Sequence, residues 1–193
     1  MELTKLFNAQ RQLDEHIEKE HPRQPGEDRL AKKILALHVE LGELANEWRG
    51  FKFWSRDQKP RTIEHKFERF VDNLGNIEIL KNPLLEEYVD NIHFAVSIAL
   101  DLNVKPEKIA EFIITNVSPK KSIEDKFLYV NKKLVDLYEE IRDRNSANAV
   151  YYWVRLFEQL LQLGTILGFS WDEIEAAYFE KNKINHIRQE NFY

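Results

Sequence analysis

Apolar residues recur at helical spacing along most of this chain. Two stripes show the pattern most clearly: the first is Leu6, Gln10, Leu13 and Ile17, and the second is Leu37, Leu41, Leu44 and Trp48. Side chains three and four positions apart lie on one face of an α-helix, so each stripe predicts an amphipathic helix. Residues 84–102 are apolar nearly all round, which predicts a helix at the centre of a bundle. No segment shows convincing strand alternation.

Glycine and proline residues divide this pattern into about seven helices. The residues 170–173 read Ser-Trp-Asp-Glu, the pattern of a capping box, so we expect the last helix to begin near Trp171. Residues 56–83 are polar and irregular, and we expect them to form an inserted loop with a short helix. The sequence therefore predicts an all-α helical bundle, with one domain over residues 1–193 and an insertion at about 56–83. The glycine and proline residues that separate the predicted helices lie at residues 22–26, Gly50, Pro60, Pro83, Pro106, Pro119, Gly164 and Gly168.

Composition favours a globular protein with a small ligand. The chain has 193 residues, of which 43% are hydrophobic, enough for a sizeable core. Its formal net charge is −5 without a block of five or more like charges, which disfavours a nucleic-acid surface or a polybasic membrane patch. The absence of cysteine excludes thiol catalysis and disulfides. No apolar run approaches the roughly 20 residues of a membrane span, and the start lacks a signal pattern, so we expect a cytoplasmic protein.

Two pairs of acidic residues stand three positions apart inside segments that otherwise resemble core helices. They are Glu40 with Glu43, and Glu87 with Asp90. A carboxylate beside a core is unfavourable unless something pairs with it. Hard divalent cations bind through carboxylate oxygens, often together with substrate phosphates. At about 100° per residue, Glu47 shares the face of Glu40 and Glu43. We therefore predict a magnesium site that acts on phosphates.

Two other interpretations of these acids remain open. In the first, they form solvated helix edges and pair with nearby lysines, as glutamates on amphipathic helices commonly do. In the second, they hold a di-iron centre of the kind found in helical bundles. That centre requires Glu-x-x-His motifs on facing helices, and neither His38 nor His93 stands at the required spacing.

Four segments spread over the chain carry motifs of a known family: residues 10–14, 40–54, 86–94 and 180–189. They resemble the dimeric all-α dUTP diphosphatases, relatives of the MazG-type nucleoside triphosphate pyrophosphohydrolases. The resemblance implies a homodimer that hydrolyses dUTP to dUMP and pyrophosphate and also accepts dUDP. Two departures stand out. The interval between the acid pairs is longer than usual, and the chain ends in Phe192-Tyr193 where the family has Gly-Tyr.

The resemblance also implies roles for individual residues. Glu40, Glu43, Glu87 and Asp90 would hold two or more Mg²⁺ ions that bridge the triphosphate. One glutamate of the first pair would activate the attacking water; the spacing leaves open which one, and we assign this role to Glu43 rather than Glu40. The substrate-binding residues would be Gln10, Asp14, Asn46, Glu47, Lys52, Trp54, His93, Phe94, Lys181, Asn182, Asn185, Arg188 and Gln189.

The residues of the last helix also predict phosphate binding on their own. Lys181, Asn185 and Arg188 lie within about 60° of one another on a helix, with Asn182 and Gln189 beside them. Such a strip of cationic and amide donors is suited to phosphate oxygens. The alternative is a frayed polar helix end on the surface.

Gln10 and Phe94 are the candidates for contact with the base. A glutamine in an apolar stripe offers both a donor and an acceptor, which uracil requires; the alternative is a core glutamine bonded to its own protein. Phe94 shares the acid face of its helix and could stack on a pyrimidine, although most such phenylalanines are core residues. Lys52 lies between two aromatic residues and could reach a phosphate or merely extend over them.

Two rival functions follow from these alternatives. A MazG-type hydrolase acting on another nucleotide, such as dCTP, would share the acids but lack residues that read uracil. A helical dimerisation or adaptor module would carry the acids only to solvate its helices. Binding of magnesium and of a non-hydrolysable dUTP analogue separates the two, because the adaptor should bind neither.

Overall fold

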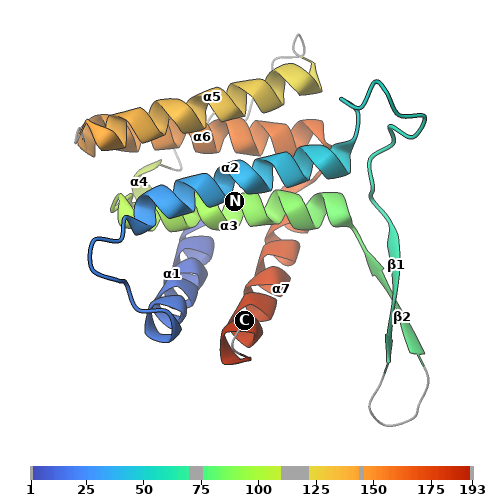
Figure 1. Ribbon diagram of the computed structural model, residues 1–193, viewed down its shortest axis with the longest axis horizontal. Coiled ribbons are helices and arrows are strands. Elements are labelled where there is room, and N and C mark those ends of the chain that lie inside the picture. The colour runs from blue at the N-terminus through green and yellow to red at the C-terminus, as the bar shows by residue number, and fades with distance from the viewer. Residues whose placement is uncertain (1, 70–75, 110–121, 144–145, 192–193) are drawn as a thin grey trace.

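The fold is a helical bundle with one small hairpin (Figure 1). The computed structural model describes residues 2–69, 76–109, 122–143 and 146–191. Within them the helices are α1 (Leu3–Glu20), α2 (Arg29–Trp48), α3 (Pro83–Asp101), α4 (Pro106–Ile109), α5 (Ile123–Arg142), α6 (Ser146–Ile166) and α7 (Trp171–Glu190). The predicted all-α fold is thereby confirmed. None of these helices combines the length and apolarity that crossing a bilayer would require.

Helix α3 lies at the centre of the bundle and contacts α1, α2, α6 and α7. In Figure 1, α2, α3, α5 and α6 run in similar directions, whereas α1 and α7 lie together below them. Most side chains of α3 are buried, as its nearly continuous apolar sequence predicts. The polar side chains of Asn91, His93 and Ser97 on α3 are therefore buried against neighbouring elements rather than exposed to bulk solvent.

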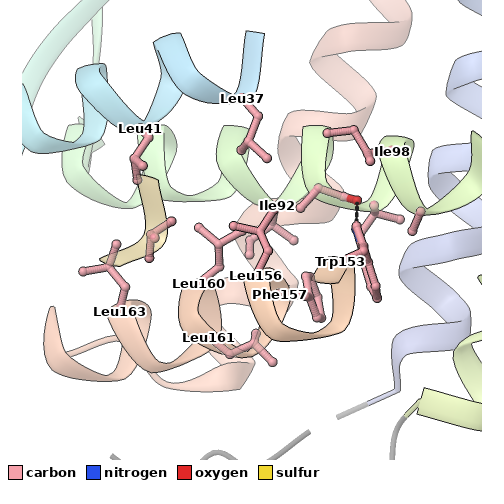
Figure 2. Packing of buried hydrophobic residues seen from close by; sticks show 14 of the residues in the cluster. Leu37, Leu41, Ile92, Ile98, Trp153, Leu156, Phe157, Leu160, Leu161 and Leu163 are labelled. Carbon is pink, nitrogen blue, oxygen red and sulfur yellow. Dashed lines mark hydrogen bonds between the residues drawn. The ribbon is translucent and has the colours of Figure 1, made fainter. Parts of the chain in front are cut away.

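The core between α2, α3 and α6 is built from interdigitating leucine, isoleucine and aromatic side chains (Figure 2). Trp153 is fully buried and stacks on Phe157, with ring centroids 4.9 Å apart. Its indole Nε1 donates a hydrogen bond to the Ala95 carbonyl, 2.8 Å away. Tyr88 donates similarly to the Leu160 carbonyl at 3.0 Å. Because buried donors need partners, these two bonds hold α3 in a defined register against α6.

Side-chain caps determine where the helices that carry the site begin. The Asp28 carboxylate accepts from the Ala31 amide at the start of α2, and the Asn82 side chain accepts from the Leu85 amide at the start of α3. At α7, Ser170 and Glu173 form the reciprocal capping box. The predicted start of the last helix at Trp171 is therefore confirmed.

The inserted segment differs from its prediction. Instead of a short helix it contains an antiparallel hairpin of β1 (Glu64–Arg69) and β2 (Asn76–Lys81), with Glu64 opposite Lys81. The alternation of Ile77 and Ile79 with Glu78 is the period-two signal that favours a strand. In Figure 1 the hairpin extends away from the ends of α2 and α3. The prediction of a short helix within residues 56–83, and of no strand, is wrong for this hairpin.

Candidate active site

Three carboxylates converge where α2 and α3 pack side by side. Glu40 projects from α2, and Glu87 and Asp90 project from neighbouring turns of α3. One oxygen from each lies within 4.8 Å of the others, and all three side chains are half-buried. Like charges so close in a partly dry site repel one another unless a cation or a proton intervenes. The group therefore has the composition and spacing of a site for a hard divalent cation.

The pKa values of these acids reflect their burial and the repulsion between their charges. Burial, then the nearby Asp90 and Glu43 charges, raises the pKa of Glu40 to about 7. Burial and the same two neighbours, followed by Glu40, raise the pKa of Glu87 to about 7. Burial also raises the pKa of Asp90, against the opposing effect of Lys181. Near neutral pH the group therefore retains protons that a bound cation would displace.

Glu43 and Glu47 lie outside this trio. The Glu43 side chain is exposed, and it acts on Glu40 and Glu87 through its charge. Glu47, one turn further along α2, accepts a hydrogen bond from Arg61 Nη1 at 3.1 Å. Of the four predicted metal ligands, the structure thus groups three and leaves Glu43 at the rim.

A cavity of about 550 Å³ lies between α1, α2, α3 and α7, and Asp90 is the member of the acid trio that lines it. Asp90 lines it together with Phe94, Gln10, Asp14 and Asn185. Its size lies within the range of sites for small molecules. With His93, which also lines it, six of the residues predicted to bind metal or substrate therefore share one cavity, although they come from three different helices.

Gln10 is held on both sides of its amide. Its Oε1 accepts hydrogen bonds from Tyr178 Oη and from His93 Nδ1, each at 2.8 Å, and its Nε2 donates to Asp14 Oδ1 at 2.7 Å. Burial lowers the pKa of His93 to about 3, so the imidazole is neutral. Because a carbonyl oxygen only accepts, the proton of His93 is assigned to Nδ1. The amide of Gln10 is thus bonded within the protein, as the core alternative for this residue describes.

Asp14 connects this arrangement to α2 and α3. Its Oδ2 accepts from Ser97 Oγ at 2.6 Å and pairs with Lys33 Nζ at 3.1 Å. Lys33 also pairs with Asp101, 2.8 Å away. The sequence did not single out Ser97, Lys33 or Tyr178. A signal existed for Ser97, because Asp90, Phe94, Ser97 and Asp101 recur at helical spacing on an otherwise apolar helix.

The α7 residues predicted to bind phosphate have different positions. Lys181 Nζ lies 2.5 Å from Asp90 Oδ2. Asn185 lines the cavity, and its Oδ1 accepts from Arg188 Nη1 at 3.4 Å. Asn182 is buried against α1, where its amide approaches the Ala9 carbonyl at 3.5 Å. Gln189 has a buried Oε1 without a hydrogen-bond partner among the described residues. Only part of the predicted strip therefore faces the cavity.

The predicted substrate-binding residues in the last turn of α2 and just after it lie outside the cavity. Lys52 contacts the Asn46 side chain and lies over the Phe51 ring, 5.7 Å from its centroid. Trp54 is 66% exposed and packs edge-on against Phe51 and Phe53. Asn46, Lys52 and Trp54 are therefore absent from the residues that line the cavity with Gln10.

Comparison with known proteins assigns the chain to a family. The family model described as dUTPase matches residues 2–78 and 75–193, which together are nearly the whole chain. None of the curated proteins compared with the chain matches it. The family match covers the helices that carry the three acids, the cavity and α7. The chain therefore belongs to the all-α dUTPase family, and this membership indicates dUTP diphosphatase activity.

Proposed function

We propose that this protein hydrolyses dUTP to dUMP and pyrophosphate with Mg²⁺ bound at Glu40, Glu87 and Asp90. The observation that carries the proposal is the convergence of these three half-buried carboxylates within 4.8 Å. Their oxygens are the ligands that Mg²⁺ prefers, and burial and the neighbouring carboxylates, which raise the pKa values of Glu40 and Glu87, disfavour the ionised forms that a bound cation would stabilise. Two or more ions, shared with the triphosphate, would suit this number of oxygens. Bound magnesium stabilises charge on the transferring phosphoryl group and lowers the pKa of bound water.

Residues around the ligands would orient the substrate. Glu43 lies beside the three acids yet remains exposed, a position suited to accepting a proton from the attacking water. Lys181, Asn185 and Arg188 would bind the phosphates from α7. A diphosphate could occupy the same groups, so we include dUDP as a second substrate.

The uracil would lie deeper in the cavity. Phe94 lines the cavity and offers an aromatic face for stacking. Tyr178, His93 and Asp14 hold the Gln10 amide in one orientation, so the polar groups around Gln10 in the cavity lining have fixed positions. A site preorganised in this way discriminates between bases because a wrong base leaves polar groups unpaired. We therefore propose selectivity for dUTP over dCTP, which disfavours the MazG-type rival.

A hydrolysis panel tests this proposal. Release of pyrophosphate would be measured from dUTP, dCTP and dTTP, each with Mg²⁺ and with a chelator. We expect Mg²⁺-dependent turnover of dUTP and much slower turnover of the other two, since cytosine carries a donor at position 4 and thymine a methyl group. Comparable rates for dCTP and dUTP would support the broader pyrophosphohydrolase, and absence of any turnover would support the adaptor module.

We also propose that the protein is a homodimer that associates through α2 and α5. Leu35, Val39, Val135 and Tyr138 are exposed along these helices, and Leu35 is 63% accessible. Leu35, Val135 and Tyr138 line a groove of about 410 Å³ together with Ala31, Ile34, His38 and Leu134. A contiguous exposed apolar patch is typical of an interaction surface.

Sedimentation can test this interface. Leu35→Glu should shift the protein to monomers, because a charge would be buried in an apolar contact. Leu80→Glu is the matched control, since Leu80 is similarly exposed, at 67%, but lies on the hairpin. A dimer that survives Leu35→Glu would place the interface elsewhere.

Three further statements stay predictions: one catalytic domain spans residues 1–193, it carries an insertion at about 56–83, and the protein is cytoplasmic.

A further inference from the structure

Lys181 already occupies part of the acid site. Its ammonium lies 2.5 Å from Asp90 Oδ2, and each side chain is only 15% exposed. The positive charge of Lys181 lowers the pKa values of Glu40, Glu87 and Asp90 against the effect of burial, so it acts on all three candidate ligands. This is a largely desolvated ion pair rather than a surface contact, and such pairs interact more strongly than exposed ones.

The ammonium and a divalent cation compete for Asp90. A magnesium ion would lie about 2.1 Å from a ligating carboxylate oxygen. With Lys181 unmoved, two cations would then stand within a few ångströms of each other in a partly dry site, which is strongly unfavourable. Binding of the ion through Asp90 therefore requires the lysine ammonium to leave this carboxylate.

The displaced ammonium needs new acceptors, and the substrate can supply them. A lysine side chain has three donors and no acceptor, on a flexible stem that can swing without moving its helix. On the same helix Asn185 faces the cavity that Asp90 lines. A triphosphate bound to the metal would bring anionic oxygens to this region. Without nucleotide, Lys181 would lose its ion pair and gain only water.

We propose that Lys181 is a resident counter-ion: it neutralises Asp90 in the empty enzyme, yields that carboxylate to the metal, and then binds the triphosphate. This inference rests on the proposed function. The exchange has a thermodynamic consequence. Without nucleotide, breaking the ion pair of Lys181 costs free energy and weakens metal binding. With nucleotide present, the displaced ammonium binds the phosphates, and this contact favours metal binding. Metal and nucleotide should therefore bind with positive coupling that depends on Lys181, and each should raise the affinity for the other by the same factor.

Three variants separate the charge of Lys181 from its other properties. Lys181→Met removes the charge and keeps an unbranched side chain, whereas Lys181→Arg keeps the charge. Lys183→Met is the matched control, because Lys183 lies on the same helix, is 72% exposed and pairs only weakly with Glu180 at 3.5 Å. Thermal unfolding of each variant would verify that the bundle remains folded.

The experiment is calorimetric titration of Mn²⁺ into each protein, first alone and then with a non-hydrolysable dUTP analogue. A pH of about 8.5 keeps the carboxylates ionised, so loss of the lysine charge does not act through their protonation. Without nucleotide, we expect Lys181→Met to bind Mn²⁺ about tenfold more tightly than the parent, because no ion pair must be broken. Lys181→Arg and Lys183→Met should stay within about threefold. With the analogue present, the advantage of Lys181→Met should disappear.

The outcomes distinguish this inference from the function on which it rests. If the parent binds Mn²⁺ and Lys181→Met binds it equally or more weakly without nucleotide, the counter-ion role is wrong while the metal site stands. If the parent binds no Mn²⁺ with or without the analogue, both the proposed metal site and the counter-ion role are wrong. Tighter binding by Lys183→Met as well would show only a general charge effect and would also overturn the specific role of Lys181.

Discussion

The carboxylate of Asp14 accepts a hydrogen bond from the Gln10 amide, 2.7 Å away. Its other oxygen accepts from Ser97 and pairs with Lys33, so the single acid connects α1 to α2 and α3. Gln10 in turn accepts from His93 and Tyr178. The orientation of the Gln10 amide in the cavity lining therefore depends on Asp14.

Removal of Asp14 should destabilise the fold as well as the site. Asp14→Ala leaves the Lys33 ammonium and the Gln10 amide without this partner, and we expect a loss of about 2–3 kcal/mol in the free energy of unfolding, measured in urea. Ser97→Ala removes only one neutral donor and should cost about 1 kcal/mol. An Asp14→Ala protein as stable as the parent would show that the network contributes nothing to the fold.

Glu43 should matter for turnover more than for metal affinity. It is exposed and lies outside the trio of Glu40, Glu87 and Asp90. If it accepts the proton of the attacking water, Glu43→Gln should reduce kcat at least about a hundredfold while the Mn²⁺ affinity changes little. Glu86→Gln on α3 is the control, since that acid contacts Lys81 instead. A normal kcat in Glu43→Gln would show that another residue acts as the general base.

The metal-free protein should lose stability as pH rises from about 4.5 to about 7. Glu40 and Glu87 have ordinary pKa values of 4.5 and values of about 7 in the folded protein. Between these limits the folded state binds more protons than the unfolded state, so unfolding becomes easier as pH increases. Comparison with the Glu40→Gln/Glu87→Gln double variant isolates this effect from other groups. Thermal unfolding across this range should show the smaller pH dependence in the variant, and an unchanged dependence would contradict the assigned pKa values.

The end of α7 should be required for activity but not for folding. Deletion of residues 181–193 removes Lys181, Asn185 and Arg188 but retains Tyr178 and Ile174, which are buried in the core. We expect a folded, metal-binding dimer with activity reduced by orders of magnitude, and weaker nucleotide binding in Arg188→Ala. Hydrogen exchange should show protection of this segment after addition of Mg²⁺ and a dUTP analogue. Unchanged exchange in this segment, together with full activity of the truncated protein, would show that residues 181–193 are only a polar helix end without a role in catalysis.

The sequence predicted the features that depend on local periodicity. Stripes such as Leu37 to Trp48 and the cap at Ser170 specify helices through contacts within a few residues, and both are present. The paired acids predicted which helices meet at the site. Spacing alone does not distinguish Glu40 from Glu43, because which of them faces α3 depends on the rotation of α2 in the bundle.

Features that depend on long-range packing could not be predicted from the pattern of residues along the chain. The contact between Asp14 and Ser97 joins residues 83 positions apart, and that between Gln10 and Tyr178 spans 168. The hairpin was missed because its strands are short and its polar composition resembles that of a loop. The pairing of Lys181 with Asp90 likewise required the arrangement of α3 and α7, since either residue could have faced solvent.

The most direct test of the metal centre is the rate of dUTP hydrolysis during a titration of Mg²⁺ into chelator-treated protein, for the parent and for Asp90→Asn. Asp90→Asn removes one charged ligand and leaves the side-chain volume nearly unchanged. The parent should be inactive without divalent ions and recover fully with Mg²⁺, releasing dUMP and pyrophosphate. Asp90→Asn should remain at least about a hundredfold slower at saturating Mg²⁺. Metal-independent hydrolysis by the parent, or a rate for Asp90→Asn within a few fold of the parent, would contradict the assignment of these carboxylates as the catalytic metal site.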